Sequence, residues 1–105
     1  MQWTRGKSFD TLCPIGPWIV TDLDPTNLAI NAYVNGEHRV ETNANLAYFD
    51  PFRLLEFITA CMTLLPGDVV STGASFLEEV QPGDEVTIEI QGIGRLTNPV
   101  IADTD

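Results

Sequence analysis

Apolar and polar residues alternate along two stretches of the chain, and this period of two predicts β-strands. In the first stretch, residues 28–34, every second residue is apolar: Leu28, Ile30, Ala32 and Val34. Asn35 and Gly36 follow directly, and these residue types tolerate the positive φ angles of a type I′ turn. We therefore expect a β-hairpin whose return strand lies near residues 37–41.

The second alternating stretch, residues 85–90, places apolar side chains on one face and polar side chains on the other. The two faces are Val86, Ile88 and Ile90 against Glu85, Thr87 and Glu89. The acidic residues on the polar face are most simply solvated. Gly92 and Gly94 then bracket a tight reversal into a further strand at residues 96–100.

A helical period replaces the alternation after Asp50. Asp50 is a favourable N-cap residue, and Pro51 fits the first helical position, where its missing N–H is not needed. The apolar residues that follow are spaced for one face of a helix that ends before Pro66: Leu54, Leu55, Ile58, Cys61 and Met62. We expect a short helix near residues 51–62 whose apolar face packs into the core.

A Pro-Gly turn occurs twice, in "LPGDVV" at residues 65–70 and in "QPGDEV" at residues 81–86. In each case proline and glycine fit the two central positions of a type II turn that leads into a strand. Residues 1–16 have no regular period, and they lead to a short strand predicted at residues 18–20. Together these elements predict a mainly β (α+β) chain with one short helix.

The composition fits a single globular domain over residues 1–105. Of the 105 residues, 44% are hydrophobic and 19% are charged, so the chain is too apolar to be intrinsically disordered. A domain of this size buries roughly two-thirds of its surface. Five basic and fifteen acidic residues give a net charge of −10, which repels phosphate backbones and argues against nucleic acid as a partner.

The two cysteines, Cys13 and Cys61, lack metal-ligand spacing and are too few for a disulfide scaffold. We interpret them as free, buried thiols, which suits a reducing compartment. No signal-like pattern begins the sequence, and no apolar run approaches the roughly 18 residues that cross a bilayer. The expected location is therefore cytoplasmic, with no membrane as a partner.

Several short motifs, taken in order, resemble the fumarylacetoacetate hydrolase family in the later half of its catalytic domain. They span nearly the whole chain: "RGKSFDT" with "GPWIV", "VNGE" at 34–37, "LLPGDVVSTG" at 64–73 and "PGDEVTIEIQGIGRLTNPV" at 82–100. The resemblance implies a mixed β-sandwich or roll, of which residues 1–105 would form the C-terminal portion. It also implies a usually dimeric enzyme that cleaves, decarboxylates, isomerises or hydrates β-diketo or 2-oxo acids with Mg²⁺, or a similar ion such as Mn²⁺ or Ca²⁺.

Within these motifs the resemblance singles out four residues. Lys7, the only lysine in the chain, would stand beside the metal ion, where a compact ammonium holds a substrate carboxylate or stabilises an enolate. Thr11 would lie near the ion, and Thr72 and Gly73 would contact the substrate. Without the resemblance, Lys7 is simply a solvated lysine, Thr11 bonds its own loop, and Thr72 and Gly73 end a strand in a tight turn.

Three features depart from the family pattern. The family's metal ligands, a Glu-x-Glu pair and a later aspartate, fall upstream of the first residue, and no pair in this chain replaces them. Glu78 and Glu79 are adjacent and would point apart on a strand, whereas a hard cation needs converging oxygens. Residues 74–79 replace a threonine, a proline and a glycine-rich loop, and residues 41–48 replace a threonine-bearing stretch. We expect an enzyme portion that is inactive alone and works as a homodimer or with an upstream segment.

A second hypothesis is a non-catalytic, truncated remnant that acts as a self-associating or binding module through its exposed strand edges. A third is a small independent β-barrel whose likeness to the family is accidental. The other notable side chains have simple interpretations. His38 follows the predicted turn on an exposed strand, with no acid or nucleophile at triad spacing. Trp3, Trp18 and Tyr33 are expected to fill the core or an interface.

Overall fold

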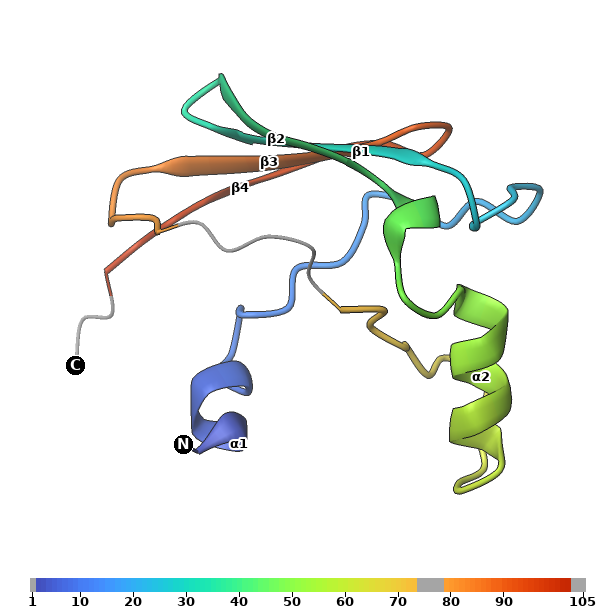
Figure 1. Ribbon diagram of the computed structural model, residues 1–105. Coiled ribbons are helices and arrows are strands. Elements are labelled where there is room, and N and C mark those ends of the chain that lie inside the picture. Colours follow the sequence, from blue (N-terminus) through green and yellow to red (C-terminus); the bar gives the residue numbers. More distant parts are fainter. Residues whose placement is uncertain (1, 74–78, 103–105) are drawn as a thin grey trace.

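The computed structural model describes residues 2–73 and 79–102, and its centre is one antiparallel β-sheet (Figure 1). Within these residues the elements are, in chain order, α1 (Trp3–Lys7), β1 (Ala29–Val34), β2 (Glu37–Asn43), the 3₁₀ helix η1 (Ala44–Leu46), α2 (Pro51–Thr59), β3 (Glu85–Ile90) and β4 (Gly94–Pro99). The strands lie in the order β2-β1-β3-β4, and each neighbouring pair is antiparallel. The predicted mainly β class with a short helix near residues 51–62 is confirmed.

β1 and β2 form the predicted hairpin, and its turn residues explain why the chain reverses there. Asn35 and Gly36 have φ angles of 52° and 77°, in the left-handed region that a type I′ turn requires. The Asn35 side chain also reaches the start of β3. Its Nδ2 donates to Asp84 Oδ1 over 2.8 Å, and its Oδ1 accepts from the Glu85 N–H over 2.9 Å. The hairpin and β3 are therefore tied together at this end of the sheet.

Alternation along the strands gives the sheet one apolar and one polar face. Partners between β1 and β3 on the apolar face are Ile30 with Ile90, Ala32 with Ile88, and Val34 with Val86. On the polar face Arg95 forms an ion pair with Glu89 and lies 5.2 Å from the centroid of the Tyr33 ring. His38 is exposed as predicted and bonds Asn31 Oδ1 over 2.9 Å.

The apolar face is thinly covered. Among the described residues, the buried hydrophobic side chains are Leu28, Ala32 and Val34, and no large side chain is fully buried. The accessible surface is 8854 Å², whereas a compact monomer of this mass exposes about 5800 Å². The radius of gyration is 15.2 Å, against about 13 Å for a compact chain of this length. Folding therefore buries about half of the extended chain's surface, and not the roughly two-thirds expected.

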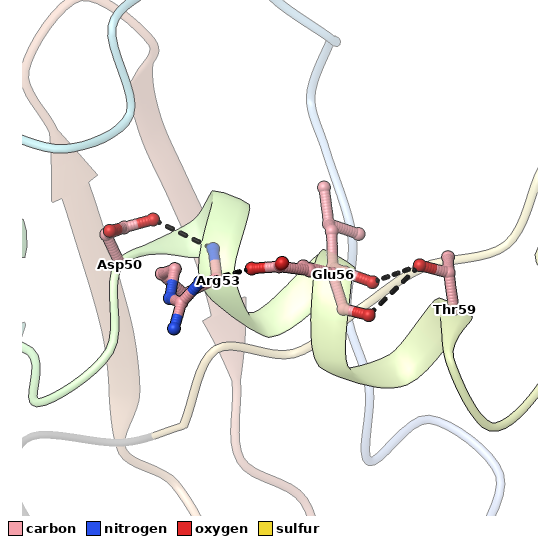
Figure 2. Close-up of polar contacts among 5 residues, drawn as sticks. Asp50, Arg53, Glu56 and Thr59 are labelled. Carbon is pink, nitrogen blue, oxygen red and sulfur yellow. Dashed lines mark hydrogen bonds and ion pairs between the residues drawn. The ribbon is translucent and has the colours of Figure 1, made fainter.

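α2 begins as predicted, but the prediction that its apolar face packs into the core was wrong. Asp50 Oδ1 caps the helix by accepting from the Arg53 N–H over 2.9 Å (Figure 2). Leu55 is nevertheless 40% exposed, and Met62 is 61% exposed. The reason is that α2 lies away from the sheet (Figure 1), and extensive contacts between described elements are confined to neighbouring strands.

Two predicted strands do not form in the described chain. Residues 18–20 are irregular, and Ile19 is 89% exposed. Residues 69–73, which follow the first Pro-Gly turn, are also irregular. A strand needs a neighbouring strand to accept its backbone hydrogen bonds, and both stretches lie outside the sheet.

The cysteines and tryptophans are more exposed than predicted. Cys13 and Cys61 are free thiols, but both are exposed. Trp3 and Trp18 are exposed as well. Cys13, Cys61 and Trp3 belong to the loops and helices that lie apart from the sheet, whereas Trp18 contacts the sheet at Ile93 and Gly94. Little of the described chain covers these four side chains. None of the described helices is long and apolar enough to span a membrane.

Candidate functional site

Lys7 is the last residue of α1, a five-residue helix in a region predicted to be irregular. The Ser8 N–H donates to the Thr4 carbonyl over 3.0 Å and closes the last turn. Arg5 and Lys7 both lie in that turn, where the helix dipole favours positive charge. The Lys7 side chain is exposed, so its ammonium is accessible to a ligand that approaches this segment.

Thr11 occupies a strained backbone position directly after α1. Its φ angle is 68°, in the left-handed region that costs an L-residue about 1–2 kcal/mol. The surrounding turn is closed by the Leu12 N–H, which donates to the Phe9 carbonyl over 3.2 Å. Because strain of this kind is concentrated at functional sites, it adds a structural reason to keep Thr11 as a candidate.

Trp18 fastens the segment that carries Lys7 and Thr11 to the sheet. Its indole Nε1 donates to the Ile93 carbonyl, in the β3–β4 turn, over 2.6 Å. The ring lies against Gly94, where an added Cβ would be 3.1 Å from Trp18 Cζ2. Pro14, Gly16 and Pro17, just before the tryptophan, line a hollow of about 300 Å³ on the apolar side of β3 and β4. The loop is therefore held across the apolar face of the sheet.

Thr72 and Gly73 line a larger hollow of about 500 Å³, which we call the η1 hollow. It lies between the start of β1, η1 with the residues that follow it, the start of α2 and the β3–β4 turn. Most of its wall is apolar or aromatic, including Leu28, Leu46 and Tyr48. Among the described lining residues, neither Lys7 nor Thr11 is present. The structure thus places the adjacent residues Thr72 and Gly73 on one hollow and leaves Lys7 and Thr11 on the α1 segment.

The wall of the η1 hollow is shaped by two side-chain caps. Asn43 ends β2, and its Oδ1 accepts from the Asn45 N–H over 2.9 Å, which starts η1. Asp50 starts α2 in the same way, and Arg53 then pairs with Glu56 along the helix (Figure 2). Asn43 itself faces the hollow. Both caps are local, so the sequence between β2 and α2 determines the shape of this wall.

Sequence reasoning missed the contribution of residues 41–48 to the site. Only their departure from the family pattern was noted, yet Asn43, Leu46 and Tyr48 all line the η1 hollow. No periodic pattern marks this stretch. The available signal was its position, since a segment between the end of one strand and the N-cap of a helix commonly forms the rim of a site.

The described residues do not fit a divalent metal ion. No group of three or more His, Cys, Asp or Glu side chains in residues 2–73 and 79–102 converges as a metal site, and Mg²⁺ requires several oxygen ligands at one point. Of the adjacent pair considered from the sequence, Glu79 is exposed and Glu78 lies outside the described residues. Residues 74–77, the first part of the altered loop, also lie outside them.

Two aspartates have lowered pKa values, and both belong to turns. Hydrogen bonds from the Thr26 N–H and hydroxyl lower the pKa of Asp24. Hydrogen bonds from the Gln81 N–H and from the Asn35 amide lower the pKa of Asp84. Neither carboxylate lines the η1 hollow, so these shifts reflect the stability of the fold.

Comparison with known proteins gives a consistent picture over nearly the whole chain. A family model described as fumarylacetoacetate (FAA) hydrolase C-terminal matches residues 1–101. The 4-hydroxyphenylacetate degradation bifunctional isomerase/decarboxylase of Salmonella dublin is 48% identical over 104 residues, which cover 94% of this chain and 24% of that protein.

Two solved structures show the same similarity in three dimensions. The 5-carboxymethyl-2-hydroxymuconate delta-isomerase from Mycobacterium smegmatis has a TM-score of 0.93 and 48% identity, over 99% of this chain and 42% of that one. The maleylpyruvate hydrolase from Sphingobium sp. SYK-6, in complex with manganese (II) ion and pyruvate, has a TM-score of 0.86 and 33% identity, over 91% of this chain and 38% of that one. The chain therefore spans less than half the length of these relatives.

Proposed function

The chain belongs to the fumarylacetoacetate hydrolase family, and we propose that it supplies the substrate-facing part of a metal-assisted enzyme. The reaction would be isomerisation, decarboxylation or carbon–carbon bond hydrolysis of a small 2-oxo or β-diketo acid. The observation that carries this proposal is that Thr72 and Gly73, selected from the family motif, line the η1 hollow. Its volume of about 500 Å³ is within the range of small-molecule sites.

The proposed roles follow from the chemistry of each side chain. The Thr72 hydroxyl would donate a hydrogen bond to a substrate oxygen, and Gly73, with no side chain, leaves room for the substrate beside the backbone. The Lys7 ammonium would pair with the substrate carboxylate or with negative charge that develops on an enolate oxygen, and this role requires α1 to approach the η1 hollow, which Lys7 does not line here. Thr11 would lie near the metal ion, as its position in the motif suggests.

Metal binding is the part of this function that the described residues do not fit. We propose that the carboxylate ligands come from a complementing segment and that the ion is Mg²⁺ or Mn²⁺, since a related hydrolase holds manganese. The exposed surface supports such a partner. The chain exposes about 3000 Å² more than a compact domain of its mass, and permanent interfaces bury about 2000–5000 Å².

A second candidate function is a non-catalytic module that self-associates, for instance as a homodimer. The same exposed apolar surface favours it, as do β2 and β4, which form the two edges of the described sheet and leave backbone groups available for pairing. Sedimentation together with ligand titration separates the two functions. A stable dimer that binds no 2-oxo acid would support the module, whereas 2-oxo acid binding would support the enzyme portion.

The direct test of the proposed function is titration of the chain with pyruvate, followed by NMR chemical shifts. Thr72→Val removes the hydroxyl from the η1 hollow and should weaken pyruvate binding about five- to tenfold, as expected for one lost hydrogen bond of about 1–1.5 kcal/mol. Thr63→Val is the matched control, because Thr63 is exposed and does not line the hollow. Equal affinity in wild type and Thr72→Val would remove the basis for the proposal.

A further inference from the structure

β2 and β4 form the two edges of the described sheet, and they differ in how readily another strand can pair with them. The charged or titratable side chains of β2 are Glu37, His38, Arg39 and Glu41. Its register with β1 also shifts between Ala32 and Tyr33, as at a β-bulge. Charges and bulges are features by which edge strands resist pairing. β4 has a regular register with β3, and Arg95, its one charged residue, is paired with Glu89.

Backbone hydrogen bonds at the end of β4 determine which of its residues face outward. The Val100 N–H donates to the Asp84 carbonyl over 2.7 Å, and the Val100 carbonyl accepts from the Gly83 N–H over 2.8 Å. Successive residues of an antiparallel strand direct their backbone groups to opposite sides. The residues that face β3 are therefore Gly94, Leu96 and Asn98, and those that face the free edge are Arg95, Thr97 and Pro99.

The outer edge of β4 is closed at both ends and open between them. At one end the Ile93 carbonyl accepts a hydrogen bond from Trp18 Nε1 over 2.6 Å. At the other end Pro99 has no N–H to donate. The open groups are the N–H and the carbonyl of Arg95 and of Thr97, beside which no other strand of the described chain lies. Each of these two residues offers one donor and one acceptor, which is what an antiparallel copy of the same strand needs.

We propose that two copies of this chain pair antiparallel through β4, with Leu96 of one copy opposite Leu96 of the other, so that their sheets join into one. In this register Arg95 of each copy exchanges hydrogen bonds with Thr97 of the other, and all the open groups are satisfied. A register centred on Arg95 would place like charges directly opposite each other. A register centred on Thr97 would place Arg95 opposite Pro99, whose missing N–H leaves the Arg95 carbonyl without a donor.

The surface beside this edge suits a second copy. Leu96 lines the hollow on the apolar side of β3 and β4, and the pairing would bring the hollows of the two copies side by side. Trp18 is 61% exposed and lies against Gly94, which this register places opposite Asn98 of the second copy. The chain exposes about 3000 Å² more than a compact domain of its mass, whereas a standard interface buries about 800 Å² on each partner.

This pairing goes beyond the proposed function and does not depend on it. No residue of β4 is among the described residues that line the η1 hollow, so a 2-oxo acid and a second copy would bind at different places. Because β4 contains no acidic residue, the net charge of −10 opposes pairing less at this edge than at β2.

Sedimentation equilibrium of the full chain tests the pairing. We expect a dimer with a dissociation constant on the order of 10–100 µM, as for other small interfaces. Thr97→Pro removes one outward N–H from each copy, and with it half of the intermolecular hydrogen bonds, and should weaken the dimer at least tenfold. Glu41→Pro is the matched control, because the Ala44 N–H bonds Leu28 and the alternation then directs the Glu41 backbone outward from β2. It should leave the dimer unchanged. A monomer at about 1 mM, or equal weakening by both prolines, would overturn the proposal.

Cysteine cross-linking tests the register without a proline in the strand. The background is Cys13→Ser with Cys61→Ser, because both native thiols are exposed. Leu96→Cys would place two thiols in a pair whose Cα atoms lie about 4.5 Å apart, within reach of a disulfide. Asn98→Cys is the matched control, since Asn98 lines the same hollow but would lie about 13 Å from its copy. We expect at least tenfold more disulfide-linked dimer from position 96, and similar yields from both positions would contradict the proposed register.

Discussion

The turn at residues 65–68 and the turn at residues 81–84 have the same local structure and different surroundings. In each, the aspartate N–H donates to the carbonyl three residues earlier over 3.0 Å. The aspartate carboxylate accepts from the N–H of that same residue over 2.7 Å. Gly67 and Gly83 have φ angles of 98° and 99°. Two similar sequences therefore form the same type of turn.

Within the described residues, the second turn leads into a strand and the first does not, because the second turn forms hydrogen bonds with distant residues. The Asn35 amide nitrogen donates a hydrogen bond to Asp84 Oδ1, and the Asn35 amide oxygen accepts one from the Glu85 N–H. The Val100 N–H donates to the Asp84 carbonyl over 2.7 Å, and the Gly83 N–H donates to the Val100 carbonyl over 2.8 Å. The first turn is followed by irregular residues. A Pro-Gly-Asp sequence thus determines a turn, whereas the strand after it depends on a neighbour elsewhere in the chain.

Removing the distant partner of the second turn should have the largest effect. Asn35→Ala loses two side-chain hydrogen bonds, to Asp84 and from the Glu85 N–H, and places alanine at a φ of 52°, and each of the three changes is worth about 1 kcal/mol. We expect a loss of about 3 kcal/mol in the free energy of unfolding, measured with urea. Asn35→Gly, which accepts the positive φ, should lose about two-thirds as much. Equal losses in the two variants would show that the backbone conformation contributes nothing.

Acid should weaken the second turn through Asp84. Its pKa lies below the ordinary value of 3.8 because the Gln81 N–H and the Asn35 amide bond the ionised form. Its stabilising contribution is therefore complete above about pH 4 and is lost as the pH falls through the lower, folded-state pKa. Asp84→Asn should lower the melting temperature at pH 7. Between pH 7 and pH 2 the melting temperature of the variant should also fall less than that of the wild type, because the variant has no carboxylate to protonate at this position. Melting curves from pH 7 to pH 2 test this, and identical acid dependence in the two proteins would refute it.

The smallest effect is expected when the first turn is given the sequence of the second. Val69→Glu converts "PGDVV" to "PGDEV", the sequence that leads into β3 at residues 82–86. Because Val69 is exposed, its replacement should change stability by less than about 0.5 kcal/mol. The amide of Val70 should exchange with solvent as fast as before. Strong protection of that amide would mean that the local sequence alone can create the strand.

The same distinction explains how much of the fold could be predicted from the sequence. The Asn35-Gly36 turn and the Asp50 cap were predictable, because each depends on a few adjacent residues. The exposure of Leu55 and of the Cys61 thiol, and the absence of a strand at residues 18–20, were not predictable. Each depends on whether another element lies alongside. Helical or alternating spacing shows that a face is apolar, and it does not show what covers that face.

The same distinction separates the candidate site residues that could be predicted from the sequence from those that could not. Thr72 and Gly73 were predicted from a continuous motif, and both line the η1 hollow. Leu46 and Tyr48 were missed, because their role depends on the path of the chain between β2 and α2. That Lys7 and Thr11 do not line this hollow could not be predicted either. It depends on how α1 and its loop are fastened by Trp18 to the β3–β4 turn.

Whether the η1 hollow receives the 2-oxo acid can be measured through intermolecular nuclear Overhauser effects. The chain would be labelled with ¹³C and mixed with unlabelled pyruvate. The pyruvate methyl group should show cross-peaks to the Thr72 methyl and to other side chains that line the hollow, such as Leu46. Cross-peaks confined to Phe57 and Ala60, which line the neighbouring hollow on α2, would contradict the account.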